Sequence, residues 1–156
     1  MSDLKSVLND IMNEYKNKVI QSIPKMTQQI AIDLEPQFKE IVSTAIDGFY
    51  MNAQPKMYDR TGNFDSIKDS VKVSASRNEV TIHVGEENMS SYPGMFGQAL
   101  DSSTAFDYFY LNGEHGHGKW NIGYSYPPFQ YVEDKLNSIE VQNVISNSVQ
   151  KILDDI

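Results

Sequence analysis

Hydrophobic residues recur at steps of three and four along the first fifty positions, which is the spacing of an amphipathic helix. The stripe consists of Leu4, Leu8, Ile11, Tyr15, Val19, Ile23, Met26, Ile30, Phe38, Ile41, Ala45 and Phe49. Pro24 can open a new helix, and Pro36 clashes with the turn that precedes it. The pattern therefore predicts two or three helical segments, or one long bent helix. Its apolar face suits either packing against a sheet or pairing with a partner helix.

The pattern changes to strict alternation between residues 71 and 84. Apolar residues alternate with polar ones before and after a polar turn at 74–78: Val71 and Val73, then Val80, Ile82 and Val84. Alternation places successive side chains on opposite faces of a strand, and two such runs around a short turn predict an antiparallel hairpin. We expect Asn63 or Asp65 to cap a short helical turn just before this hairpin.

Residues 86–105 show no sustained period and predict a long loop. The aromatic segment 106–113 favours a strand, with a short helix as the alternative. From Phe129 the chain is expected to be helical, with a final stripe of Val141, Ile145, Val149, Ile152 and Ile156.

This order of elements predicts an α+β fold. Its parts are a long N-terminal helix or helix pair, a small antiparallel β-sheet, and a C-terminal helix packed on the sheet. We expect a single domain over residues 1–156, with a helical N-terminal region at 1–50 and an α+β core at 56–156 that contains the long loop 86–105.

Composition narrows the functional classes. The chain has 13 Lys and Arg against 21 Asp and Glu, a net charge of −8, of which −5 falls in residues 101–156. Such acidity argues against general nucleic-acid binding and against docking on anionic lipid. The absence of cysteine excludes disulfides, thiolate metal sites and cysteine nucleophiles. No apolar run reaches the roughly 18 residues of a membrane span, and no signal-peptide pattern opens the chain.

The histidine-rich segment Glu114–Gly118 is the main candidate for metal chemistry. In a strand, His115 and His117 would point to one face, with Glu114 as a third ligand or a base. Glycines flank both histidines, which favours a polar loop instead. His83, the third histidine, is expected on the polar face of its strand.

Aromatic residues concentrate between positions 92 and 131. They have two interpretations, as contacts between subunits and as cover for the open face of a small sheet. The candidate subunit contacts are Tyr92, Phe96, Phe109, Tyr110, Trp120, Tyr124 and Tyr126.

Four segments occur in an order found in a known family. They are Arg60-Thr61-Gly62 followed by Ser66-Ile67, the apolar hairpin ending at Val84-Gly85, the aromatic turn Tyr108–Gly116 that includes Gly113, and Pro127-Pro128-Phe129. Together, over residues 56–155, they resemble the small tail-component proteins of tailed bacteriophages, which are neck or tail-completion proteins. Gly62 is expected to supply a tight turn, and Thr61 or Ser66 to cap the short helix.

The resemblance implies a structural virion protein and not an enzyme, made in the host cytoplasm and without a cofactor. Such proteins form rings of six or twelve copies at the head–tail interface. Their neighbours are portal or adaptor proteins and tail-tube or terminator proteins, and DNA passes through the ring without specific binding. If the acidic last third faced that channel, its charge would keep DNA from sticking. The alternative is a small metal-binding enzyme that uses Glu114–Gly118.

Overall fold

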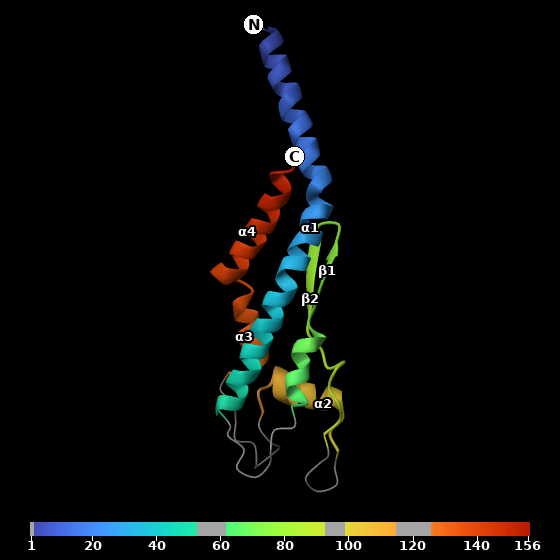
Figure 1. Cartoon of the computed structure of the whole chain (residues 1–156), viewed down its shortest axis with the longest axis vertical. Coiled ribbons are helices and arrows are strands. Elements are labelled where there is room, and N and C mark those ends of the chain that lie inside the picture. The colour runs from blue at the N-terminus through green and yellow to red at the C-terminus, as the bar shows by residue number, and fades with distance from the viewer. Residues whose placement is uncertain (1, 53–61, 93–98, 115–125) are drawn as a thin grey trace.

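The computed structural model describes residues 2–52, 62–92, 99–114 and 126–156 (Figure 1). Its elements are α1 (Ser2–Asn52), the 3₁₀ helix η1 (Phe64–Ser70), β1 (Lys72–Ser76), β2 (Glu79–His83), α2 (Ser102–Phe106), the π-helical turn η2 (Asp107–Leu111), α3 (Pro128–Lys135) and α4 (Ile139–Leu153). The predicted α+β fold is confirmed, with a long N-terminal helix, a two-stranded antiparallel sheet and C-terminal helices.

The N-terminal region is one long helix, α1, which contains both prolines. Pro24 and Pro36 lie on its exposed side, so each removes a backbone N–H from the helix without removing a core contact. Figure 1 shows α1 as a bent rod whose N-terminal part extends beyond the rest of the molecule. Proline is a usual cause of such bends.

The C-terminal part of α1 is the centre of the fold. The hairpin lies on one side of it, and α3 and α4 lie on the other (Figure 1). Phe38 and Val42 are completely buried, and the core continues through Phe49 and Phe64, whose rings meet edge-on at 4.9 Å. The stripe of α1 thus packs against the sheet as expected, but only from about Met26 onward.

The predicted hairpin is confirmed, but its turn is residues 77–78 and not 74–78, because β1 continues to Ser76. β1 and β2 pair antiparallel from Lys72 opposite His83 to Ser76 opposite Glu79. Arg77, in the turn, has a positive φ of 24°. The inward face is half-buried and the outward face, including His83, is exposed, as the alternation predicts.

The packing of the C-terminal helix differs from the prediction, because α4 lies against α1 and not on the sheet. Its buried positions are Val141, Ser148 and Ile152, whereas Ile145 is exposed. The buried hydroxyl of Ser148 has two acceptors within reach, Asp33 Oδ2 of α1 at 2.7 Å and the Val144 carbonyl oxygen of its own helix at 2.8 Å. The contact with Asp33 turns this face of α4 toward α1, an orientation that the apolar residues of α4 alone do not indicate.

The long loop predicted for residues 86–105 ends earlier than expected. Asp101 caps α2 by accepting a hydrogen bond from the backbone N–H of Thr104 at 2.8 Å. The helix then continues directly into η2, so the aromatic segment 106–113 is mainly helical and not a strand. The strand expectation failed because the capping pattern at Asp101 outweighs the β-propensity of the aromatic residues.

Candidate assembly site

A groove of about 530 Å³ lies between β2 and α3, which we call the β2 groove. It is lined by Phe38, residues 79–84, Phe106, Tyr110, Leu111, Phe129, Val132, Glu133 and Leu136. One edge of β2 is paired with β1, and within the described part of the chain no strand pairs with the other edge. The groove is therefore a gap in the layer of elements around α1.

The floor and far wall of the groove are formed mainly by apolar and aromatic side chains. Phe38 of α1 lies at the floor and is fully buried. On the far side Tyr110 stacks on Phe106 at 4.8 Å, and Phe129 meets Tyr110 edge-on at 6.2 Å. Phe129 and Leu136 keep 41% and 43% of their surface exposed at the rim. Exposed apolar side chains around a preformed recess are typical of a contact surface.

The near wall is the edge of β2 with which no described strand pairs. A strand edge of this kind presents backbone N–H and C=O groups to a segment that enters. Such edges bind extended peptides by adding them as a further strand, while the alternate side chains fill apolar pockets. The β2 groove offers both parts of that arrangement side by side.

The charge of the groove is negative. Glu79 and Glu133 contribute carboxylates to its walls, and none of the described residues that line it is Lys or Arg. His83 Nε2 lies 2.5 Å from Glu87 Oε1 at the end of β2. A hydrogen bond from its own backbone N–H and the contact with His83 lower the pKa of Glu87. An occupant with apolar side chains and a basic residue would match this lining.

Gly85 makes room for the pair of His83 and Glu87. A Cβ at position 85 would lie 2.8 Å from His83 Nε2 and would also collide with the Glu87 carboxylate. Glycine at the end of β2 thus permits the two side chains to close over the backbone.

Several residues of the family resemblance have clear structural positions. Gly62 and Gly113 both have positive φ, of 73° and 68°. Ile67 is fully buried in the core. Pro128 is the first residue of α3, and the next residue, Phe129, lines the β2 groove. Arg60, Thr61 and Gly116 lie outside the described residues.

Hydrogen bonding around η1 differs from the expected capping. Asn63 occupies the N-cap position, but its side chain makes no cap hydrogen bond. Instead it donates to the Ser90 carbonyl at 2.6 Å and accepts from the Ser90 N–H at 2.7 Å. The Ser66 hydroxyl donates to the Asn63 carbonyl at 2.5 Å. Asn63 therefore fastens the segment after β2 to η1, a long-range role that local spacing does not reveal.

The aromatic candidates for subunit contacts separate into two groups. Tyr110 is buried, and Phe109 packs edge-on against Phe64 at 5.6 Å and against Tyr92 at 5.3 Å, so these rings belong to the core of the subunit. Tyr126 is exposed, and its hydroxyl donates to Asp134. The remaining candidates, Phe96, Trp120 and Tyr124, lie outside the described residues.

The candidate metal segment is only partly described. Glu114 is half-buried, and its backbone N–H donates to the Tyr108 carbonyl at 2.7 Å. His115 and His117 lie outside the described residues. Within the described ranges, no three His, Asp or Glu side chains come close enough to hold a metal ion.

A second apolar surface lies on the part of α1 that extends beyond the fold. Leu4, Leu8, Ile11 and Tyr15 are 68%, 52%, 57% and 55% exposed. Their spacing continues the stripe that is buried farther along the same helix. Spacing alone could not tell the covered part of the stripe from the uncovered part.

Among the helices that the structure describes, none combines the length and apolarity needed to cross a bilayer. Comparison with protein-family models, curated proteins and solved structures found no match to this chain.

Proposed function

We propose that this protein is a structural virion component of a tailed bacteriophage, a ring-forming subunit of the neck or tail-completion assembly and not an enzyme. The observation that carries the proposal is the β2 groove, an apolar recess beside the edge of β2 that pairs with no strand in the described ranges. Its occupant would be a different surface of the next copy. A contact of this kind is heterologous, and it closes into a ring when its rotation divides a full turn.

The lining of the groove indicates how the contact would form. An extended segment of the neighbouring subunit adds to the edge of β2 through main-chain hydrogen bonds. Its apolar side chains pack over Phe38 and against Phe129, and a basic residue meets Glu79 or Glu133. Main-chain pairing fixes the register, and the apolar floor supplies most of the affinity.

The family resemblance supports the virion assignment. Phe129, from the Pro-Pro-Phe segment, is part of the groove, and Gly62 and Ile67 form the turn and core contact that lead into the hairpin. The neighbours of the ring would be a portal or adaptor protein on one side and a tail-tube or terminator protein on the other. The acidic last third would face passing DNA without binding it.

Oligomeric mass and particle content test the proposal. Light scattering coupled to size-exclusion chromatography, with negative-stain imaging, should give closed rings of six or twelve copies, alone or with a neighbouring virion protein. Leu136→Glu should abolish the rings, because it places a carboxylate on the apolar rim beside Glu133. Ile139→Glu is the matched control, since Ile139 is 72% exposed at the start of α4 and does not line the groove.

Two results would contradict the proposal. One is a chain that stays monomeric with every candidate neighbour and is absent from purified particles. The other is an equal effect of Leu136→Glu and Ile139→Glu on assembly, which would mean that the groove does not take part in the contact between subunits.

A further inference from the structure

The N-terminal part of α1 carries apolar side chains that no described part of the chain covers. Figure 1 shows this part of the helix extending alone past the end of α4. Its exposed apolar residues are Leu4, Val7, Leu8, Ile11, Met12 and Tyr15, each more than half exposed. The apolar side chains of such a helix can be removed from contact with water only if the helix associates with another surface.

The spacing of these residues matches a helical bundle. Leu4 and Ile11 are seven residues apart, as are Leu8 and Tyr15, so the two pairs occupy the two core positions of a heptad repeat. Val7 and Met12 flank this seam and widen it on both sides. A wider apolar face is buried more completely between several helices than between two.

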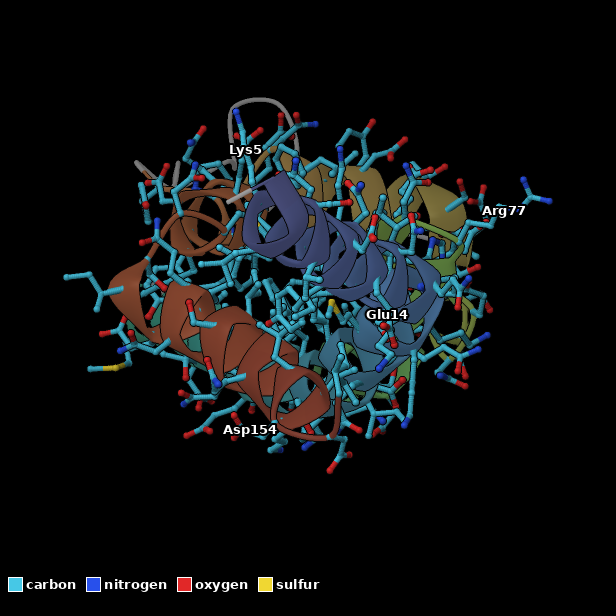
Figure 2. The ribbon with its side chains drawn as sticks, turned by 90° about the horizontal axis from the view of Figure 1, so that it is seen from above. Lys5, Glu14, Arg77 and Asp154 are labelled. Atoms are coloured by element: carbon cyan, nitrogen blue, oxygen red, sulfur yellow. The ribbon has the colours of Figure 1, made fainter. Side chains whose placement is uncertain are left out.

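Charged residues border the stripe asymmetrically. At about 100° of rotation per residue, Lys5 and Lys16 lie along one border, and Asp10 and Glu14 lie along the other. Figure 2 shows Lys5 and Glu14 pointing to opposite sides of α1. Lys18 lies on the acidic side at the end of the stripe, where its Nζ is 3.1 Å from Glu14 Oε1.

This asymmetry distinguishes the possible orientations. When identical helices associate in parallel, each basic border faces the acidic border of the next helix. When they associate antiparallel, like borders meet, which places Lys5 and Lys16 on one flank of the interface and Asp10 and Glu14 on the other. Charge complementarity therefore selects the parallel arrangement of copies of this same helix.

The net charge of the segment also permits self-association. Residues 4–23 contain three lysines and two acidic residues, a net charge of +1, whereas the whole chain carries −8. Bringing several copies of the segment together thus adds little like-charge repulsion, unlike bringing the acidic bodies together.

We propose that residues 4–19 of α1 from several copies of this chain associate as a parallel helical bundle. The bundle ends before Pro24, near which the helix joins the folded body. The proposal goes beyond the virion role and uses a surface separate from the β2 groove. It predicts self-association whether or not the protein enters a virion.

Cysteine crosslinking tests both the contact and its direction, because the chain contains no cysteine. Leu4→Cys should crosslink to itself under mild oxidation, since parallel helices bring equivalent positions together. In the antiparallel pairing that sets Leu8 opposite Ile11, Leu4 lies opposite Tyr15 instead. A mixture of Leu4→Cys and Tyr15→Cys chains would then crosslink to each other.

The outcomes of this experiment are distinct. Crosslinking of Leu4→Cys alone supports the bundle, with Ile32→Cys as a control, since Ile32 is 66% exposed on the part of α1 that belongs to the body. Crosslinking only in the mixture overturns the parallel arrangement. No crosslinking in either sample overturns self-association.

Substitutions measure the strength of the contact. Leu8→Glu with Ile11→Glu should weaken self-association about 100-fold or more, because unpaired carboxylates enter the apolar seam. Both side chains are exposed in the subunit, so the circular dichroism of the body should not change. The control Ile32→Glu should leave association unchanged.

Charge reversal tests the borders. Lys5→Glu with Lys16→Glu makes both borders acidic and should weaken association, as should Asp10→Lys with Glu14→Lys, which makes both basic. Mixing the two reversed proteins should restore it. Failure of the mixture to associate would overturn the charge pairing. The Leu136→Glu variant should still associate through residues 4–19, which would show that the bundle does not depend on the β2 groove.

Discussion

Asp33 shows how one carboxylate joins two helices. Its Oδ2 accepts hydrogen bonds from the Ser148 hydroxyl at 2.7 Å and from Lys151 Nζ at 3.0 Å, both on α4. Its Oδ1 accepts from the side chain of Gln29 at 3.0 Å. The hydrogen bond from Ser148, followed by that from Lys151, lowers the pKa of Asp33 from its ordinary value. The charged form of this side chain therefore stabilises the contact between α1 and α4.

Substitution of Asp33 should have a pH-dependent effect. A lowered carboxyl pKa in the folded state stabilises the fold fully above the ordinary pKa, and the contribution is lost as pH falls through the folded value. We expect Asp33→Ala to lower the free energy of unfolding by about 1–3 kcal/mol near neutral pH, since it leaves Ser148 without its partner on α1. Below about pH 4 the difference from the wild type should shrink.

Urea denaturation at several pH values measures this difference. Glu40→Ala, on the exposed side of the same helix, is the control and should change stability little. A deficit for Asp33→Ala that stays constant down to pH 3 would contradict the role of its charge.

At the scale of elements, α4 depends on a capping residue as well as on packing. The Ser138 hydroxyl accepts a hydrogen bond from the backbone N–H of Val141 at 3.3 Å, which satisfies a donor of the first turn. Glu140 in that turn and Lys151 in the last turn complement the helix dipole. Because Ile139 is exposed and adds no core contact, the first turn of α4 is stabilised mainly by the Ser138 cap.

Ser138→Ala should destabilise the protein by about 1 kcal/mol, because the first turn of α4 loses its cap. Ser138→Asp should retain stability, since aspartate also accepts a hydrogen bond at this position. Thermal unfolding compares the two variants, and equal melting temperatures for Ser138→Ala and Ser138→Asp would argue against the cap.

The long helix α1 has two parts with different roles in stability. Core contacts begin at Met26, and the buried Thr27 hydroxyl lies 3.1 Å from the carbonyl oxygen of Arg77 in the hairpin turn. Most residues before Pro24 are exposed, and Figure 1 shows the N-terminal part of the helix extending beyond the body. Folding of the body should therefore not depend on them.

Removal of residues 2–22 should change the unfolding free energy of the body by less than about 1 kcal/mol while lowering the helical signal in circular dichroism. Removal of residues 2–38 should prevent folding, because it deletes the fully buried Phe38. Loss of cooperative unfolding in the shorter deletion would contradict this division of α1.

For the whole molecule, the two proposed contacts should respond oppositely to salt. The bodies carry most of the negative charge, so relief of their mutual repulsion by salt should outweigh the weakening of the one ion pair at Glu79 or Glu133 and strengthen association through the β2 groove. The borders of the bundle are oppositely charged, so screening should weaken association through residues 4–19. Each contact can be isolated by disabling the other.

Raising salt from about 0.1 M to 1 M shortens the screening length from about 10 Å to about 3 Å. Over this range Leu8→Glu with Ile11→Glu, which retains the groove, should associate more strongly. Leu136→Glu, which retains the bundle, should associate less strongly. Sedimentation equilibrium at both salt concentrations measures the change, and the same direction in both variants would contradict the assignment of the two contacts.

The elements that were predicted correctly have local causes. The alternation of apolar and polar residues from Val71 to Val84 is enough to predict the hairpin. The apolar steps of three and four residues are enough to predict the helix α1. The orientation of α4 could not be predicted, because burial of Ser148 depends on Asp33, a partner 115 positions away. Burial of a polar residue follows its hydrogen-bond partner and not its hydrophobicity.

The β2 groove could not be predicted for a related reason. Its lining combines residues of α1, β2, η2 and α3, and none of these segments marks it alone. The sequence did indicate two features that enter it, the alternation of β2 and the Pro-Pro-Phe segment before α3. That they border one recess follows only from their packing around Phe38.

The continuity of α1 has a consequence for stoichiometry. Its 51 residues span about 76 Å if straight, without a loop between the extended end and the body. If a flexible linker joined the two parts, the N-terminal segment and the body of one chain could belong to different assemblies. Because one continuous helix joins them, both parts of a chain enter the same complex. In an assembly that used both proposed contacts, the number of helices in the bundle would equal the number of bodies in the ring. The symmetry of one would then be the symmetry of the other.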